Sequence, residues 1–130
     1  MTTDLWMLVW TSVLAVLWPT VTLVGRLQTA GGFAWALGNR DTTLEVPAWV
    51  GRAERAHRNM VENVGPFAAL VLAAHVSGAA NDATALGAAI FFWARIGHAL
   101  VYTAGLVGVR TAAFFVGVFG EAMILRQLFG

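Results

Sequence analysis

The chain has 130 residues, of which 58% are hydrophobic and only 12% are charged, and its formal net charge is +1. Soluble domains carry about a quarter charged residues, so this composition argues against an ordinary soluble protein and favours a membrane protein. The small net charge gives no reason to expect a nucleic-acid partner. Cysteine is absent, which excludes disulfides and a cysteine nucleophile, and no spacing of histidines and acidic residues suggests a metal site.

The first apolar run, Leu5–Gly25, is uncharged and lies between Asp4 and Arg26. It is long enough to cross ~30 Å of hydrocarbon. It does not fit a signal peptide, because it is too long and its start carries Asp4 instead of a basic region. Pro19, near the end of this run, is a candidate position for a kink. The sequence therefore predicts a first membrane-spanning helix.

Three further helices are expected after a polar connection at residues 31–43. The second runs from Pro47, a residue favoured at the first helical position, to about Ser77. The third covers about Ala83–Val107 and the fourth about Thr111–Phe129, with Gly108 closing the turn between them. The sequence thus predicts an all-α, integral-membrane four-helix bundle that forms one four-span domain over residues 1–130.

The distribution of arginines predicts the orientation in the membrane. The side that holds the first and third connections carries Arg26, Arg40, Arg52 and Arg110. The opposite side carries Arg126 alone. Cytoplasmic loops are enriched in basic residues, so we expect the arginine-rich side to face the cytoplasm. The expected location is a bacterial inner membrane, crossed several times.

Polar residues recur on one face of the second helix, at Arg52, Arg55, Asn59 and Glu62. A charged side chain at bilayer depth costs ~2.5–3.5 kcal/mol, so such residues usually face a bundle interior or a wet cavity. Arg58 and Glu62 add an oppositely charged pair on successive helical turns. We expect these residues to bind a ligand. The alternative is a structural polar seam that holds subunits together.

The third and fourth helices carry a second polar set. Arg95, His98 and Tyr102 share one helical face, and Arg110 and Thr111 stand at the expected start of the fourth helix. A cation near a helix N-terminus is disfavoured by the helix dipole, and an anionic ligand would relieve this. The combined set suits an anion that also carries an amine.

These motifs resemble the MAPEG family, the membrane-associated proteins of eicosanoid and glutathione metabolism. The second-helix signature of that family is similar to the run Arg55-Ala56-His57-Arg58-Asn59 with Glu62 and Pro66-Phe67. The third-helix residues Arg95, His98 and Tyr102 look most like its prostaglandin E synthase and microsomal glutathione transferase branch. The motif resemblance extends from about Arg26 to Thr111.

The resemblance implies a homotrimer with glutathione bound between neighbouring subunits near the cytoplasmic face. The glutathione-binding residues would be Arg26, Arg55, Arg58, Asn59, Glu62, Arg95, His98 and Tyr102. The catalytic residues would be Arg110, which would stabilise the thiolate, and Thr111, which falls where one branch has a serine. The second substrate would be a lipophilic electrophile that arrives through the membrane lipid.

The expected function is therefore that of a glutathione-dependent membrane transferase or peroxidase. Phe114 stands where the best-known enzymes of the branch keep a tyrosine. The alternative is a non-catalytic trimeric membrane scaffold or lipid-binding subunit of the same fold.

Three placements are open to test. Arg95 either contacts the ligand or is an internal partner of Glu62 or Glu121. Glu121 pairs with Arg95 or Arg126, or faces a neighbouring subunit. The charged residues expected at the contact between protomers are Arg55, Arg58, Glu62 and Arg95.

Overall fold

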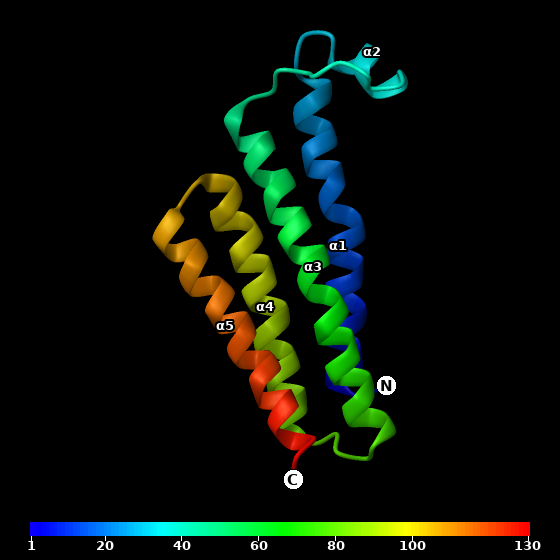
Figure 1. Ribbon diagram of the computed structural model, residues 1–130, viewed down its shortest axis with the longest axis vertical. Helices are drawn as coiled ribbons and strands as arrows, with labels where there is room; N and C mark the ends of the chain where they lie inside the picture. The colour runs from blue at the N-terminus through cyan, green and yellow to red at the C-terminus, as the bar shows by residue number, and fades with distance from the viewer.

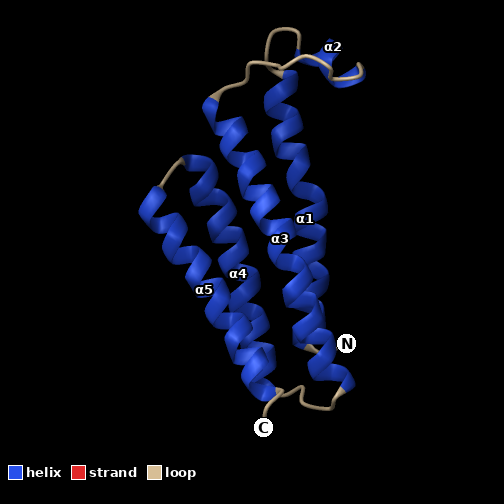
Figure 2. Cartoon of the chain, viewed as in Figure 1, coloured by secondary structure: helices blue, strands red, loops and turns tan.

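The computed structural model describes residues 1–130, and its regular structure is helical, without strands. Four long helices run side by side (Figure 1): α1 (Thr3–Leu27), α3 (Ala48–Val76), α4 (Asp82–Ala104) and α5 (Val107–Gln127). The short helix α2 (Gly32–Leu37) lies at the end where α1 finishes and α3 begins. Both termini lie at the opposite end (Figure 2).

Three of the helices, α1, α4 and α5, are long and apolar enough to cross a membrane. The prediction of an all-helical protein with membrane-spanning helices is confirmed for these three helices. The helix α3 lacks an equally apolar window, because its first half contains Arg52, Glu54, Arg55, Arg58 and Glu62. It packs between α1 and α4 and also reaches α5.

The turn between α4 and α5 differs from the predicted one. Gly105 ends α4 with a φ of 88°, and α5 begins at Val107, so Gly108 lies in the first turn of α5 and does not close the connection. A left-handed φ is readily adopted only by glycine, which explains why the helix stops here. Arg110 consequently lies within the first turn of α5, on its cavity-lining side.

The predicted polar connection contains the unexpected helix α2. Gly31 precedes it with a φ of 74°, and Gly32 lies so close to the Arg26 carbonyl that a side chain would collide with it. Both glycines are therefore required by the backbone path. The next helix, α3, begins at Ala48 directly after Pro47, within one residue of the prediction.

Two apolar clusters hold the long helices together. The first joins α3, α4 and α5 through Phe67, Val71, Ala74, Ala88, Phe91 and Ile124. Within it the rings of Phe67 and Phe91 stack with centroids 4.0 Å apart. The second joins α1, α3 and α4 through Trp18, Ala56, Met60 and Ala99.

Pro19 creates a need for a hydrogen-bond donor inside α1. It has no N–H, so the Ala15 carbonyl loses its helical partner. His57 of α3 replaces it, with Nε2 2.9 Å from the Ala15 oxygen. A carbonyl only accepts, so Nε2 carries the proton. Trp18 Nε1 donates in the other direction, to the Ala53 carbonyl at 3.1 Å. A freed backbone group at membrane depth needs such a partner, and these two bonds link α1 to α3.

The end of the molecule that holds the termini is linked through a buried carboxylate. Asp4 of α1 is only 2% exposed. Its Oδ2 accepts a hydrogen bond from Thr84 Oγ1 of α4 at 3.1 Å and lies 2.9 Å from His75 Nε2 of α3. The same Thr84 forms the capping box that begins α4 with Asn81. One side chain therefore connects three helices.

The α4–α5 contact depends on two glycines that face each other. A Cβ placed on Gly87 would lie 2.6 Å from the Gly120 carbonyl oxygen. A Cβ placed on Gly120 would lie 2.5 Å from the Gly87 carbonyl oxygen. Small residues allow membrane helices to approach closely in this way.

We expect Gly120→Ala to destabilise the protein by ~1–3 kcal/mol, because the added methyl group forces the two backbones apart. Gly97→Ala in α4 is the matched control, since a Cβ there meets nothing within 4 Å. Replacing an unhindered helix-interior glycine should stabilise by ~0.5–1 kcal/mol. Thermal unfolding in detergent measures both, and equal effects of the two variants would contradict the close contact.

Candidate functional site

A polar cavity of about 250 Å³ lies where α3, α4 and α5 meet, near the α4–α5 turn. It is lined by Asn59, His98, Tyr102, Arg110, Thr111 and Phe114. The sequence predicted the first five of these as site residues. Three helices thus bring them to one place, with Phe114 added as an apolar wall.

A cation and aromatic rings shape the cavity. The Arg110 guanidinium lies over the Tyr102 ring, 4.4 Å from its centroid. His98 packs edge-on against the same ring at 5.5 Å and lies 6.4 Å from the Phe114 ring. Thr111 Oγ1 donates to the Val107 carbonyl at 3.3 Å. The arrangement presents a fixed positive charge, an imidazole and an amide to a small ligand.

Arg95 is buried next to this cavity, one helical turn before His98, and does not line it. It is only 1% exposed, and the rings of Phe91 and Phe114 flank its guanidinium at 5.0 and 5.3 Å. One nitrogen, Nη1, donates to Asn59 Oδ1 at 3.2 Å, and the other, Nη2, donates to the Phe114 carbonyl at 3.2 Å. Gly117 gives it room, since a side chain there would collide with the guanidinium.

The ion pairs predicted for Arg95 and Glu121 do not form in the structure. Arg95 forms no ion pair with Glu62 or Glu121, and Glu121 forms none with Arg126. The Glu121 Oε1 and Arg95 Nε atoms are both buried without a hydrogen-bond partner. The expectation that Arg95 lies on an outer contact surface is wrong for the single chain, because α3, α4 and α5 cover it completely.

The charged residues of α3 that were predicted to bind the ligand do not point into the cavity as Asn59 does. Arg55, Arg58 and Glu62 are exposed on the surface of α3, whereas Asn59 turns into the cavity. The ion pairs of the structure include none of the three, so the predicted Arg58–Glu62 pair does not form. Two cations and one carboxylate therefore stand free beside the cavity, on a helix among membrane-spanning neighbours.

Arg26 lies away from the cavity, at the end of α1. Its Nη2 is 2.9 Å from Glu54 Oε2, and its guanidinium lies 5.3 Å from the centroid of Trp35. It lines a second cavity, of about 340 Å³, together with Trp35, Arg40 and Glu54. The expected glutathione-binding set is thus divided among the three-helix cavity, the outer face of α3 and the end of α1.

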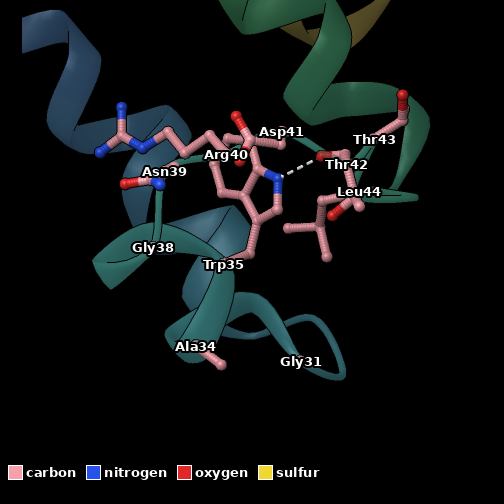
Figure 3. A pocket seen from close by; sticks show the side chains of 10 residues that line it. All are labelled: Gly31, Ala34, Trp35, Gly38, Asn39, Arg40, Asp41, Thr42, Thr43 and Leu44. Carbon is pink, nitrogen blue, oxygen red and sulfur yellow. Dashed lines mark hydrogen bonds between the residues drawn. The ribbon is translucent and has the colours of Figure 1, made fainter.

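Figure 3 shows the α1–α3 connection around Trp35, where ten residues between Gly31 and Leu44 line a hollow of about 470 Å³. The indole Nε1 donates to the Thr42 carbonyl at 2.6 Å, and Arg40 lies beside the ring at 5.4 Å. Arg40 itself adopts a φ of 62°, a conformation that non-glycine residues seldom take. No motif in the sequence signalled this arrangement, because tryptophan and arginine at a span end are common in membrane proteins.

Neither the comparison with curated proteins nor that with solved structures found a match. Among protein families, the model of the MAPEG family matches residues 5–129, which is nearly the whole chain. The match covers α1 from its third residue, the other four helices in full, and every residue of the cavity. The chain therefore belongs to the MAPEG family.

Proposed function

We propose that this protein is a glutathione-dependent membrane transferase or peroxidase that acts on lipophilic electrophiles. Within its family it would belong with the prostaglandin E synthase and microsomal glutathione transferase branch. The observation that carries the proposal is the position of Arg110, a cation held over Tyr102 in a polar cavity beside unpaired charges on α3.

The residues present fit glutathione chemically. Glutathione carries two carboxylates and one amino group. Arg55 and Arg58 offer unpaired cations for the carboxylates, and Glu62 offers an unpaired carboxylate for the amine. Charges left bare at bilayer depth are costly, so a ligand or partner that covers them offsets that cost. Asn59 and His98 line the adjoining cavity and extend the binding surface.

A neighbouring subunit would cover the outer face of α3. The helix carries too much charge to face lipid on all sides, yet it runs parallel to three apolar helices (Figure 1). We propose that α3 is the fourth span of a four-helix bundle and that three copies assemble with this face between them. The arginine-rich end, which includes Arg26, Arg40 and Arg110, would face the cytoplasm.

Each residue would have a separate task in catalysis. Glutathione supplies a thiol, which reacts with electrophiles as the thiolate. Arg110 would stabilise that charge, because a nearby cation lowers the pKa of a thiol. Thr111 could donate a hydrogen bond to sulfur only after its hydroxyl turns away from the Val107 carbonyl. Arg55, Arg58, Asn59 and Glu62 would orient the peptide.

The first prediction concerns assembly. Native mass spectrometry in mild detergents should detect a trimer, because the charged face of α3 needs a polar partner. Arg58→Leu should shift the population toward smaller species, and Arg126→Leu, at the opposite end of the molecule, should not. A monomer in every detergent would contradict the assembly.

The second prediction concerns binding. Glu62→Gln should weaken glutathione binding by ~1.5–3 kcal/mol, the range for a hydrogen bond to a charged group. Glu45→Gln, in the α1–α3 connection, is the matched control and should bind like the parent. Thermal-shift titration measures both, since a ligand that binds only the folded state raises the apparent stability. Unchanged binding by Glu62→Gln and by Arg58→Ala would favour the scaffold alternative.

The third prediction concerns chemistry. Arg110→Ala should leave glutathione affinity within a few-fold of the parent but raise the pH at which the bound thiol ionises. Near-ultraviolet difference spectra report thiolate directly. Arg110→Lys retains the positive charge and should recover part of the effect. Bound glutathione in the parent that ionises no more readily than free glutathione would contradict the catalytic role of Arg110.

A further inference from the structure

The contact between Arg95 and Asn59 determines which way the Asn59 amide points. Arg95 Nη1 lies 3.2 Å from Asn59 Oδ1. An arginine side chain has only donors, so the atom that faces it must be the amide oxygen. The two ends of an asparagine amide are opposite in character, and the oxygen end is turned toward Arg95.

The other end of the amide is free. Asn59 lines the three-helix cavity, and its Nδ2 donates to no group of the chain. This nitrogen is also absent from the buried atoms that lack a partner, so it is accessible to a ligand. With its oxygen turned to Arg95, this side chain has the two N–H donors of Nδ2 left for a ligand.

Arg95 itself has no access to the cavity. It is 1% exposed, flanked by Phe91 and Phe114, and bonded to Asn59 and the Phe114 carbonyl. A ligand in the cavity would meet Asn59, His98 and Arg110 first. Besides the through-space effect of its charge, Arg95 reaches the cavity through Asn59, the lining residue whose side chain it hydrogen-bonds.

We infer that Arg95 is a positioning residue: it holds the Asn59 amide with its N–H groups toward the cavity, so that this wall selects an anionic group of the ligand. The inference rests on the proposed glutathione function and refines it, because it replaces a direct Arg95–ligand contact with an indirect one. The group bound by Asn59 would be a carboxylate or the thiolate, both of which accept hydrogen bonds.

A double-mutant cycle tests the indirect route. Arg95→Met keeps the length of the side chain and removes its donors. It should weaken glutathione binding about tenfold in the parent but change it less than twofold in an Asn59→Ala background, because the amide to be oriented is then gone. Arg95→Lys restores a donor and should recover binding. Equal losses in both backgrounds would overturn the inference, since a purely structural Arg95 acts whether or not Asn59 is present.

A second cycle needs no ligand. Asn59→Asp puts a carboxylate opposite Arg95, which pairs a buried cation, so the melting temperature in detergent should stay the same or rise. In an Arg95→Met background the same Asn59→Asp change leaves a carboxylate unpaired and should lower the melting temperature clearly. A fall of similar size in both backgrounds would show that Arg95 does not face the amide oxygen.

The two cycles separate the possible failures. If the parent binds no glutathione, the proposed function fails, and the melting temperatures still decide whether Arg95 fixes the Asn59 amide. If the parent binds glutathione and Asn59→Asp binds it as well as the parent does, the selection of an anion by this wall is overturned, because that variant presents acceptors. Loss of binding by Asn59→Asp without loss of stability supports the inference.

Discussion

A guanidinium buried among apolar helices needs acceptors, and Arg95 of α4 takes one from α3 and one from α5. An unpaired buried charge costs several kcal/mol, so these two bonds constrain where all three helices sit. Gly117 contributes by leaving space for the guanidinium, and the rings of Phe91 and Phe114 cover it. The polar cavity lies directly above this arrangement and shares Asn59 and Phe114 with it.

Polar side chains also make hydrogen bonds between the helices at two other places. Pro19 removes a donor from α1, and His57 of α3 restores it to the Ala15 carbonyl. At the far end, buried Asp4 connects α1 to α3 and α4. Lipid offers no hydrogen bonds, so a polar group between the helices is stabilised by a partner inside the protein. These bonds therefore specify which helices are neighbours, whereas apolar contacts alone would tolerate other pairings.

The long helices could be predicted from the sequence because apolar runs and Pro47 mark them clearly. The start of α5 could not, since Gly105 and Gly108 are equivalent in the sequence and only the backbone conformation distinguishes them. Helical spacing grouped Asn59 with Arg55 and Glu62 on one face of α3. It could not tell that Asn59 turns into the cavity while Arg55 and Glu62 stay exposed, because that depends on where α4 and α5 pack.

The same limit applies to burial and to loops. The spacing of Arg95 with His98 and Tyr102 placed all three on one face, and two of them line the cavity. Arg95 is one turn deeper and is covered by residues of α5, which no local pattern could indicate. The contact of Trp35 with Arg26 is likewise a tertiary feature, formed between the end of α1 and a short helix that follows it.

The engagement of Arg26 has a thermodynamic consequence. Its guanidinium already pairs with Glu54, whose side chain is 58% exposed, and rests against Trp35. A ligand carboxylate that binds the Arg26 nitrogen now engaged by Glu54 exchanges places with the Glu54 carboxylate. Such an exchange breaks one solvent-exposed ion pair and makes another, and pairs of this kind contribute only ~0–1 kcal/mol. The balance is close to zero, so Arg26 would discriminate among ligands by shape and add little to affinity. The freed Glu54 would remain nearby as a repulsive charge, which favours ligands that place an amine, not a second anion, at that end.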